Sequence, residues 1–155
     1  NYDWDTVIMD GKSLTELSAS IPVTKKEVDA CDVTIVVCMV NAPGADSKQS
    51  VFQPGSNQGA SLLKLCRQMR AHKRPVCTIG GDAQMWQMPE KWNVMARQFI
   101  LLCRSQGVIA IDGVHYLQAM EKCWDKWHIL KTEVNTDLLS DMLLDAVNAA
   151  YAVVP

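Results

Sequence analysis

Four short apolar runs divide the chain into segments. They cover residues 6–9, 33–40, 76–79 and 108–111, with the sequences TVIM, VTIVVCMV, VCTI and VIAI. None of them alternates apolar and polar residues as a half-exposed strand does, and three are rich in β-branched residues. We therefore predict four buried strands of a parallel sheet.

Helical patterns separate these runs. Segments 59–73 and 89–106 repeat apolar residues at steps of three and four positions, which is typical of a helix with one buried face. Pro75 prevents the first helix from continuing, and Gly107 follows the second. Strands that alternate with helices predict an α/β fold, a three-layer sandwich with a short parallel sheet.

The rest of the chain completes this organisation. Two further helices are predicted over 117–130 and 137–152. A length of 155 residues corresponds to one domain, which we place at 1–155. The linker 41–58 follows the most apolar run, and a loop of this length is a candidate for function.

The charge balance excludes several classes of function. The formal net charge is −2, with 48% apolar and 21% charged residues. These values are typical of a globular protein, and they argue against a nucleic-acid partner, which usually requires a basic surplus. No apolar run approaches the roughly 20 residues of a membrane-spanning helix, so we expect no membrane span.

The cysteines occur singly along the chain. No two have the two-residue separation typical of zinc sites and redox motifs, so we expect neither a metal site nor an organic cofactor. Most are predicted to be small core hydrophobes in a reducing intracellular compartment, and a disulfide stays open. The six are Cys31, Cys38, Cys66, Cys77, Cys103 and Cys123.

Polar residues directly follow the predicted strands. Gly11 and Ser13 follow the first run, Asn41 follows the second, and Asp112 and His115 follow the fourth. In an open parallel sheet, ligands bind at the carboxyl ends of the strands. A hydroxyl, backbone and side-chain amides, a carboxylate and an imidazole are the parts of a serine hydrolase.

Two segments resemble motifs of a known family. The sequence DGVHYL, residues 112–117, resembles the last motif of the SGNH (GDSL) hydrolases, Asp-x-x-His followed by an apolar residue. The sequence DVTIVVCMVNA, residues 32–42, resembles their third block, a hydrophobic strand that ends in an asparagine. The resemblance implies an acyl ester hydrolase acting on a small-molecule ester, in which His115 is the general base, Asp112 orients it and Asn41 donates to the oxyanion.

The segment VIMDGKSLTELSASI, residues 7–21, allows two alignments with this family. As the second block, Gly11 donates its backbone amide to the oxyanion and lies 30 residues before Asn41, as is usual in the family, and the nucleophile lies upstream of this chain. As the first block, Ser13 is the nucleophile and Lys12 replaces an aspartate. Both alignments stay open.

Departures from the family pattern support a second hypothesis. Met39 replaces the glycine two residues before Asn41, and Lys12 replaces the aspartate of the first block. These changes favour a catalytically inactive binding or scaffold subunit that contacts a protein partner through its tryptophan-rich carboxyl-terminal helices. A flavodoxin-like nucleotide-binding or regulatory domain is a third hypothesis.

Each candidate residue also has a simpler interpretation. Asp112 can form a turn with the glycine after it, Asn41 can end a strand, and Ser13 can cap a helix. His72 and His128 have no partner pattern, so we predict structural roles for both.

Overall fold

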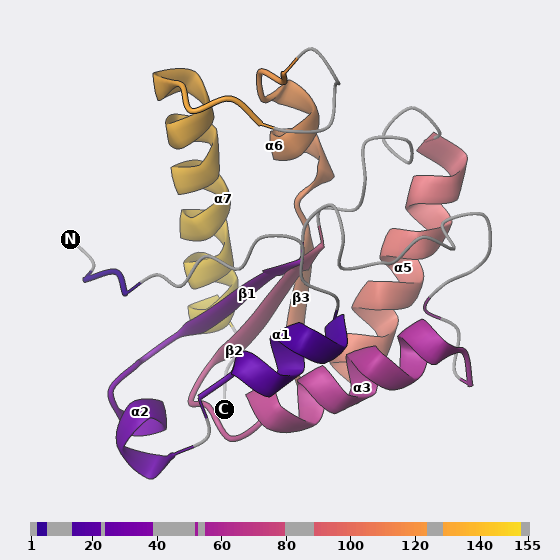
Figure 1. Ribbon diagram of the computed structural model, residues 1–155, viewed down its shortest axis with the longest axis vertical. Coiled ribbons are helices and arrows are strands. Elements are labelled where there is room, and N and C mark those ends of the chain that lie inside the picture. The colour runs from indigo at the N-terminus through magenta and orange to yellow at the C-terminus, as the bar shows by residue number, and fades with distance from the viewer. Residues whose placement is uncertain are drawn as a thin grey trace.

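The computed structural model describes most of the chain (Figure 1). The first predicted strand, 6–9, and most of the linker 41–58 lie outside the described residues. The structure describes residues 3–5, 14–22, 24–38, 52, 55–79, 89–123 and 129–152.

Three parallel strands form the described sheet, in the order β1-β2-β3. Their β-branched residues suit the extended backbone of strands that are buried on both faces. The strands predicted at 33–40, 76–79 and 108–111 are confirmed within the described residues. They are β1 (Thr34–Cys38), β2 (Pro75–Ile79) and β3 (Ile109–Asp112).

Side chains alternate between the two faces of this sheet. Val36, Cys77 and Ala110 are neighbours in register and point to one face. Val76 and Ile109, also neighbours in register, point to the opposite face. Apolar residues on both faces explain why these strands lack the alternation of a half-exposed sheet.

Helices cover both faces, so the chain has an α/β fold. α3 and α5 pack on the face of Cys77, and α7 packs on the face of Val76 through Ala146 and Ala150 (Figure 1). The helices predicted over 59–73, 89–106 and 137–152 are confirmed, with shifted ends. Their bounds are α3 (Asn57–Met69), α5 (Pro89–Ser105) and α7 (Glu133–Ala152).

A buried histidine fixes the turn after α3. His72 is 7% exposed; its Nε2 lies 2.8 Å from the carbonyl oxygen of Pro22, and its Nδ1 lies 2.8 Å from the hydroxyl of Thr34. A carbonyl oxygen only accepts, so Nε2 donates to Pro22, while Nδ1 shares a hydrogen bond with the hydroxyl of Thr34. His72 therefore joins three segments, which confirms its structural role; His128 lies outside the described residues.

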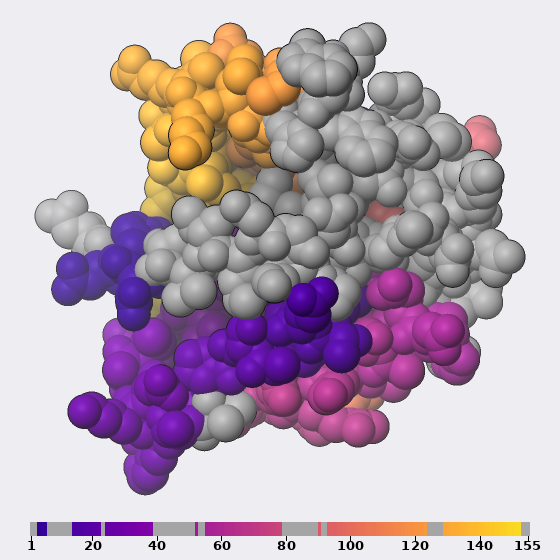
Figure 2. All heavy atoms as spheres, in the orientation of Figure 1, coloured from indigo at the N-terminus to yellow at the C-terminus, as the bar shows by residue number. Residues whose placement is uncertain are grey.

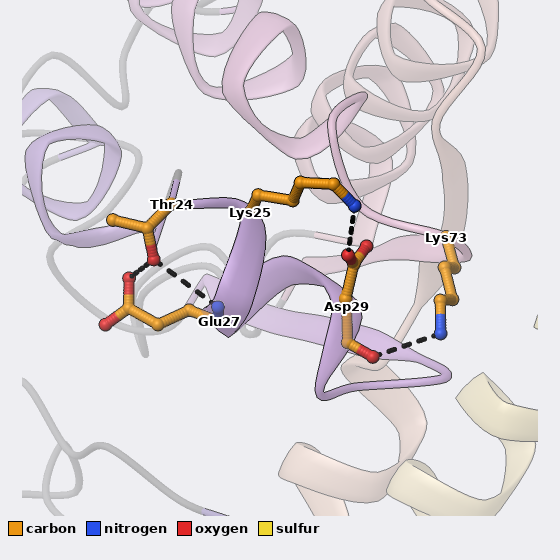
Figure 3. Close-up of polar contacts among 5 residues, drawn as sticks. All are labelled: Thr24, Lys25, Glu27, Asp29 and Lys73. Atoms are coloured by element: carbon orange, nitrogen blue, oxygen red, sulfur yellow. Dashed lines mark hydrogen bonds and ion pairs between the residues drawn. The ribbon is translucent and has the colours of Figure 1, made fainter.

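Two short helices precede the sheet. α1 (Leu14–Ser20) packs alongside α3 on the face shown in Figure 2. Leu14 is buried in the core. α2 (Lys25–Asp29) pairs Lys25 with Asp29 at 2.7 Å, and Lys73 donates from Nζ to the Asp29 carbonyl oxygen at 3.1 Å (Figure 3). These contacts are exposed, so each adds little stability.

The predicted helix over 117–130 is wrong. The chain forms instead α6 (Val114–Ala119), and Met120 has extended backbone angles. Beyond it, Lys122 and Ile129 form an antiparallel bridge, and the N–H of Leu130 donates to the Glu121 carbonyl oxygen at 3.0 Å. The described residues 120–123 and 129–130 therefore do not continue the helix that the apolar steps of three and four positions predict.

Asn135 replaces the hydrogen bonds that a longer helix would supply. Its Oδ1 accepts from the N–H of Glu121 at 2.7 Å, and its Nδ2 donates to the carbonyl oxygens of Glu121 at 2.7 Å and Leu130 at 2.8 Å. Asn135 is 4% exposed and lies in the first turn of α7. This single amide therefore fixes the segment after α6 to the start of α7.

Four buried cysteines lie in the core on the face covered by α3 and α5. Cys38 and Cys77 belong to β1 and β2, while Cys66 and Cys103 belong to the two helices. All four are 0–1% exposed, which confirms that most of the cysteines are small core residues.

Burial changes the acidity of these thiols. Burial raises the pKa of Cys38, and a hydrogen bond with Cys103 together with burial raises the pKa of Cys66. The contact with Cys103 lowers the pKa of Cys77, but burial and the nearby thiols of Cys38 and Cys66 together raise that pKa by more, so the net shift is upward. The contact with Cys66 lowers the pKa of Cys103, whereas the contact with Cys77 and burial raise it to a net upward shift. All four thiols therefore stay protonated in the folded chain at neutral pH.

Replacing Asn135 with alanine should lower the free energy of unfolding by about 2–4 kcal/mol, because three backbone groups lose their buried partner. Urea unfolding followed by circular dichroism measures the change. Asn148→Ala, an exposed asparagine on the same helix, is the matched control and should change stability by less than about 0.5 kcal/mol. Equal effects of the two substitutions would contradict the bridging role of Asn135.

The chain should lose stability in alkaline solution. Unfolded thiols release protons above about pH 8.5, whereas the buried thiols retain them, so stability is complete below that pH and falls as the pH rises. Each buried thiol contributes a slope of up to about 1.4 kcal/mol per pH unit. Urea unfolding in reductant at several alkaline pH values should show a shallower slope for Cys38→Ala than for Cys123→Ala, whose cysteine is only half-buried. Identical slopes for the two variants would show that the buried thiol does not cause the loss.

Candidate functional site

The carboxyl edge of the sheet brings the ends of the three strands together. Because the strands are parallel, Cys38, Ile79 and Asp112 all end at this edge, and Ile79 is the register partner of Asp112. Neighbouring strands lie roughly 4.8 Å apart, so the ends of β1 and β3 are about 10 Å apart on either side of β2. The distance between the ends of β1 and β3 is therefore short enough for one small ligand to contact residues that follow both strands.

Asp112 ends β3 and starts α6. Its side chain is half-buried, and its Oδ1 accepts from the N–H of Val114 at 2.9 Å. Val114 is the first residue of α6, whose early N–H groups have no partner inside the helix. The Asp-Gly turn expected at this position is therefore present, with Gly113 buried in it.

His115 lies in the first turn of α6 and is exposed to solvent. Its ring is tilted against that of Tyr116, with 4.0 Å between the centroids and 40° between the planes. Among the described residues, no hydrogen bond joins the imidazole of His115 to the carboxylate of Asp112. The two groups share one edge of the sheet and are three residues apart, but each contacts a different neighbour.

α6 is fixed at its other end by a lysine. Lys122 donates from Nζ to the carbonyl oxygens of Gln118 at 3.1 Å and Met120 at 3.0 Å. A cation at this place neutralises the negative end of the helix. Burial lowers the pKa of Lys122, because the ammonium group is partly removed from water.

Sequence reasoning missed Lys122, Tyr116 and Asn135 as neighbours of the candidate site. A lysine just beyond a helix end is a signal that can be read from the sequence once the end of the helix is known. The contact between Tyr116 and His115 follows from adjacency in the chain. Asn135 had no signal, because it acts on a segment 14 residues before it.

The other predicted site residues lie outside the described residues. These are Gly11 and Ser13, before α1, and Asn41, after β1. α1 begins at Leu14, which is 1% exposed, so the chain becomes helical directly after Ser13. β1 ends three residues before Asn41.

The described residues form neither a metal site nor a membrane span. Within residues 3–5, 14–22, 24–38, 52, 55–79, 89–123 and 129–152, no group of three or more His, Cys, Asp or Glu side chains is arranged to hold a metal ion. In the same part of the chain, no helix combines the length and apolar character needed to cross a bilayer.

Comparison of the chain with known protein families, with curated proteins and with solved structures gives no match.

Asp112→Ala should lower the free energy of unfolding by about 1–2 kcal/mol, because the start of α6 loses an acceptor for the N–H of Val114. Asp112→Asn keeps an oxygen at the same place and should cost about 0.5 kcal/mol or less. Urea unfolding of both variants measures this difference. A loss in Asp112→Asn as large as that in Asp112→Ala would show that the negative charge, rather than the turn, stabilises this end of β3.

Proposed function

We propose that this protein is a serine-type acyl ester hydrolase of the SGNH class, with the corresponding three-layer sandwich. The observation that carries the proposal is the position of Asp112 at the carboxyl edge of a parallel sheet, with the exposed imidazole of His115 in the helical turn that follows. A general base must be accessible to substrate and water, and the carboxylate that orients the base must be fixed in position by the fold. His115 meets the first requirement and Asp112 the second.

The sheet order supports this proposal. β1 leads towards Asn41 and β3 ends in Asp112, and the two strands flank β2 with their carboxyl ends at the same edge. A donor supplied after β1 and a base supplied after β3 therefore approach a bound ester from two sides. This matches the roles that the family resemblance gives to Asn41 and His115.

The proposed reaction is ordinary acyl transfer. The hydroxyl of Ser13, or of a serine upstream in the second alignment, attacks the ester carbonyl while His115 accepts its proton. The side chain of Asn41 and the backbone N–H of Gly11 donate to the oxyanion. His115 then protonates the leaving alcohol, and water attacks the acyl-enzyme with His115 again as base, so the serine is restored. The scheme requires no metal ion and no organic cofactor.

The mechanism requires one rearrangement of the described residues. The ring of His115 lies against Tyr116, so it must turn towards the Asp112 carboxylate to be oriented by it. Rotation of an exposed side chain is inexpensive, and catalytic hydrogen bonds are often long or badly aligned before substrate binds. The contact with Tyr116 is therefore the position of the His115 ring before substrate binds.

One observation favours the alternative function, a catalytically inactive scaffold of the same class. The contact of Asp112 with Val114 gives this aspartate a structural role that needs no catalysis. In this alternative the protein partner binds the carboxyl-terminal part of the chain. α6 ends at Ala119, so among the described carboxyl-terminal residues the long helical surface for such a partner is α7, which exposes Val134, Leu144 and Tyr151.

A fluorophosphonate probe distinguishes the two functions. Incubation followed by intact-mass measurement should show one adduct, and peptide mapping should place it on Ser13 in the first alignment. His115→Ala should slow labelling by about a hundredfold or more, because the serine loses its base. Ser20→Ala, which removes an exposed hydroxyl at the end of α1, should label like the unmodified chain.

The contrary results are equally specific. An adduct that forms at the same rate in His115→Ala would remove His115 from the mechanism. A chain that gives a native circular dichroism spectrum and no adduct would exclude Ser13 as nucleophile, and would leave the scaffold and the second alignment, whose serine lies upstream of this chain.

A further inference from the structure

Three thiols meet where α3 and α5 pack on the central strand. Sγ of Cys66 on α3 lies 3.8 Å from Sγ of Cys103 on α5, and both residues are 0% exposed. Cys77 on β2 lies in the same buried cluster as these two residues. Three elements that are distant in the sequence therefore each contribute a sulfur to one place in the core.

One of the three sulfurs already has another partner. Cys77 donates its S–H to the thioether sulfur of Met69, at 3.2 Å. A thioether cannot form a disulfide, so Cys77 remains a free thiol that is hydrogen-bonded to Met69. Cys66 and Cys103 remain as the pair whose sulfurs face each other across the α3–α5 interface.

We propose that Cys66 and Cys103 form a reversible oxidation site, at which a hydroperoxide joins α3 to α5 through an intramolecular disulfide. A disulfide bond is about 2.0 Å long, so the two sulfurs must approach by roughly 1.8 Å, which small side-chain rotations and a slight shift of two packed helices provide. The site uses none of the residues of the proposed hydrolase, so its test is independent of that function.

The oxidation balances with one hydroperoxide. One thiolate attacks the peroxide oxygen, which gives a sulfenic acid, and the hydroxide or alkoxide that leaves takes up the proton released by the thiol to become water or an alcohol. The second thiolate attacks the sulfenic sulfur, and the S–S bond forms as hydroxide leaves and takes up a proton. Two thiols lose two hydrogen atoms in total, and the peroxide is reduced. A dithiol reductant reverses the reaction by thiol exchange.

The packing controls the rate of this reaction. Both thiols are buried and protonated, whereas the reacting species is the thiolate, so reaction requires a local opening that admits the peroxide and releases a proton. The rate should therefore rise in urea concentrations below the unfolding transition, which increase local opening. The product then links residues 37 apart in the sequence and restricts the unfolded chain, so it should raise the melting temperature.

The test uses the full chain with Cys31→Ser and Cys123→Ser, so that the four buried thiols remain. After treatment with hydrogen peroxide in mild urea, intact mass should fall by two hydrogen atoms, and peptide mapping should identify a Cys66–Cys103 link. Dithiothreitol should restore the original mass. The melting temperature should be higher in the oxidised form and should return to its former value after reduction.

Matched variants identify the pair. Cys66→Ala and Cys103→Ala should each abolish the loss of mass, whereas Cys77→Ala, an equally buried substitution beside the same pair, should retain it. Three outcomes would overturn the proposal: no loss of mass under conditions in which the denatured chain is oxidised, a link that includes Cys38 or Cys77, or a gain of oxygen atoms at Cys66 or Cys103 in place of the link.

Discussion

Parallel pairing of β1, β2 and β3 is the constraint on which the rest of the structure depends. A parallel ladder requires each strand to return to the same end of the sheet, so a helix or loop must cross between successive strands. Pro75 in register with Thr34, and Val76 with Ile109, fix which residues point to each face. Every helix that covers the sheet and every residue at its carboxyl edge takes its position from this register, because a shift by one residue would exchange the two faces.

The two ends of α6 show how polar contacts position a short helix that has little core of its own. Six residues make fewer than two turns, and an isolated helix of this length is not stable in water. Asp112 satisfies an N–H at its start, Lys122 satisfies carbonyl oxygens at its end, and Leu117 is the residue that it buries. His115 can therefore be exposed and still be held in place, since the helix that carries it is fixed on both sides.

The secondary structure of a segment could be predicted from the sequence where residues within that segment determine it. β1 (Thr34–Cys38) and β3 (Ile109–Asp112) were predictable as strands, because their β-branched residues favour extended backbone and helices cover both faces of the sheet. The segment 117–130 was not, because the residue that determines its path, Asn135, lies beyond it and acts through side-chain hydrogen bonds to backbone groups. Periodicity alone cannot separate an irregular segment from a helix when both place apolar residues three and four positions apart.

The candidate site was also predictable only in part, because some of its contacts depend on where a helix begins and ends. Asp112 and His115 could be assigned to the end of a strand, because the apolar run before them was unambiguous, but their neighbours Val114, Tyr116 and Lys122 depend on where α6 begins and ends. A terminal shift of a few residues is the least predictable property of a helix, and here it decides whether the imidazole points into the core or into solvent.

The face that holds the buried thiols and the edge that holds His115 make different demands on the sequence. Cys77 lies between Val36 and Ala110 in register, beneath two helices, so the packing there requires a residue of small volume without a charge. Alanine and valine meet that requirement as well as cysteine does, so packing alone does not account for four thiols on one face. A contact between two sulfurs can add something that a residue of equal volume cannot. The contact of Cys77 with Met69 adds a soft packing interaction, and the contact of Cys66 with Cys103 adds the proposed reaction. Substitutions that conserve volume and remove sulfur separate the packing requirement from both uses of sulfur, because they keep the volume and abolish the sulfur contacts.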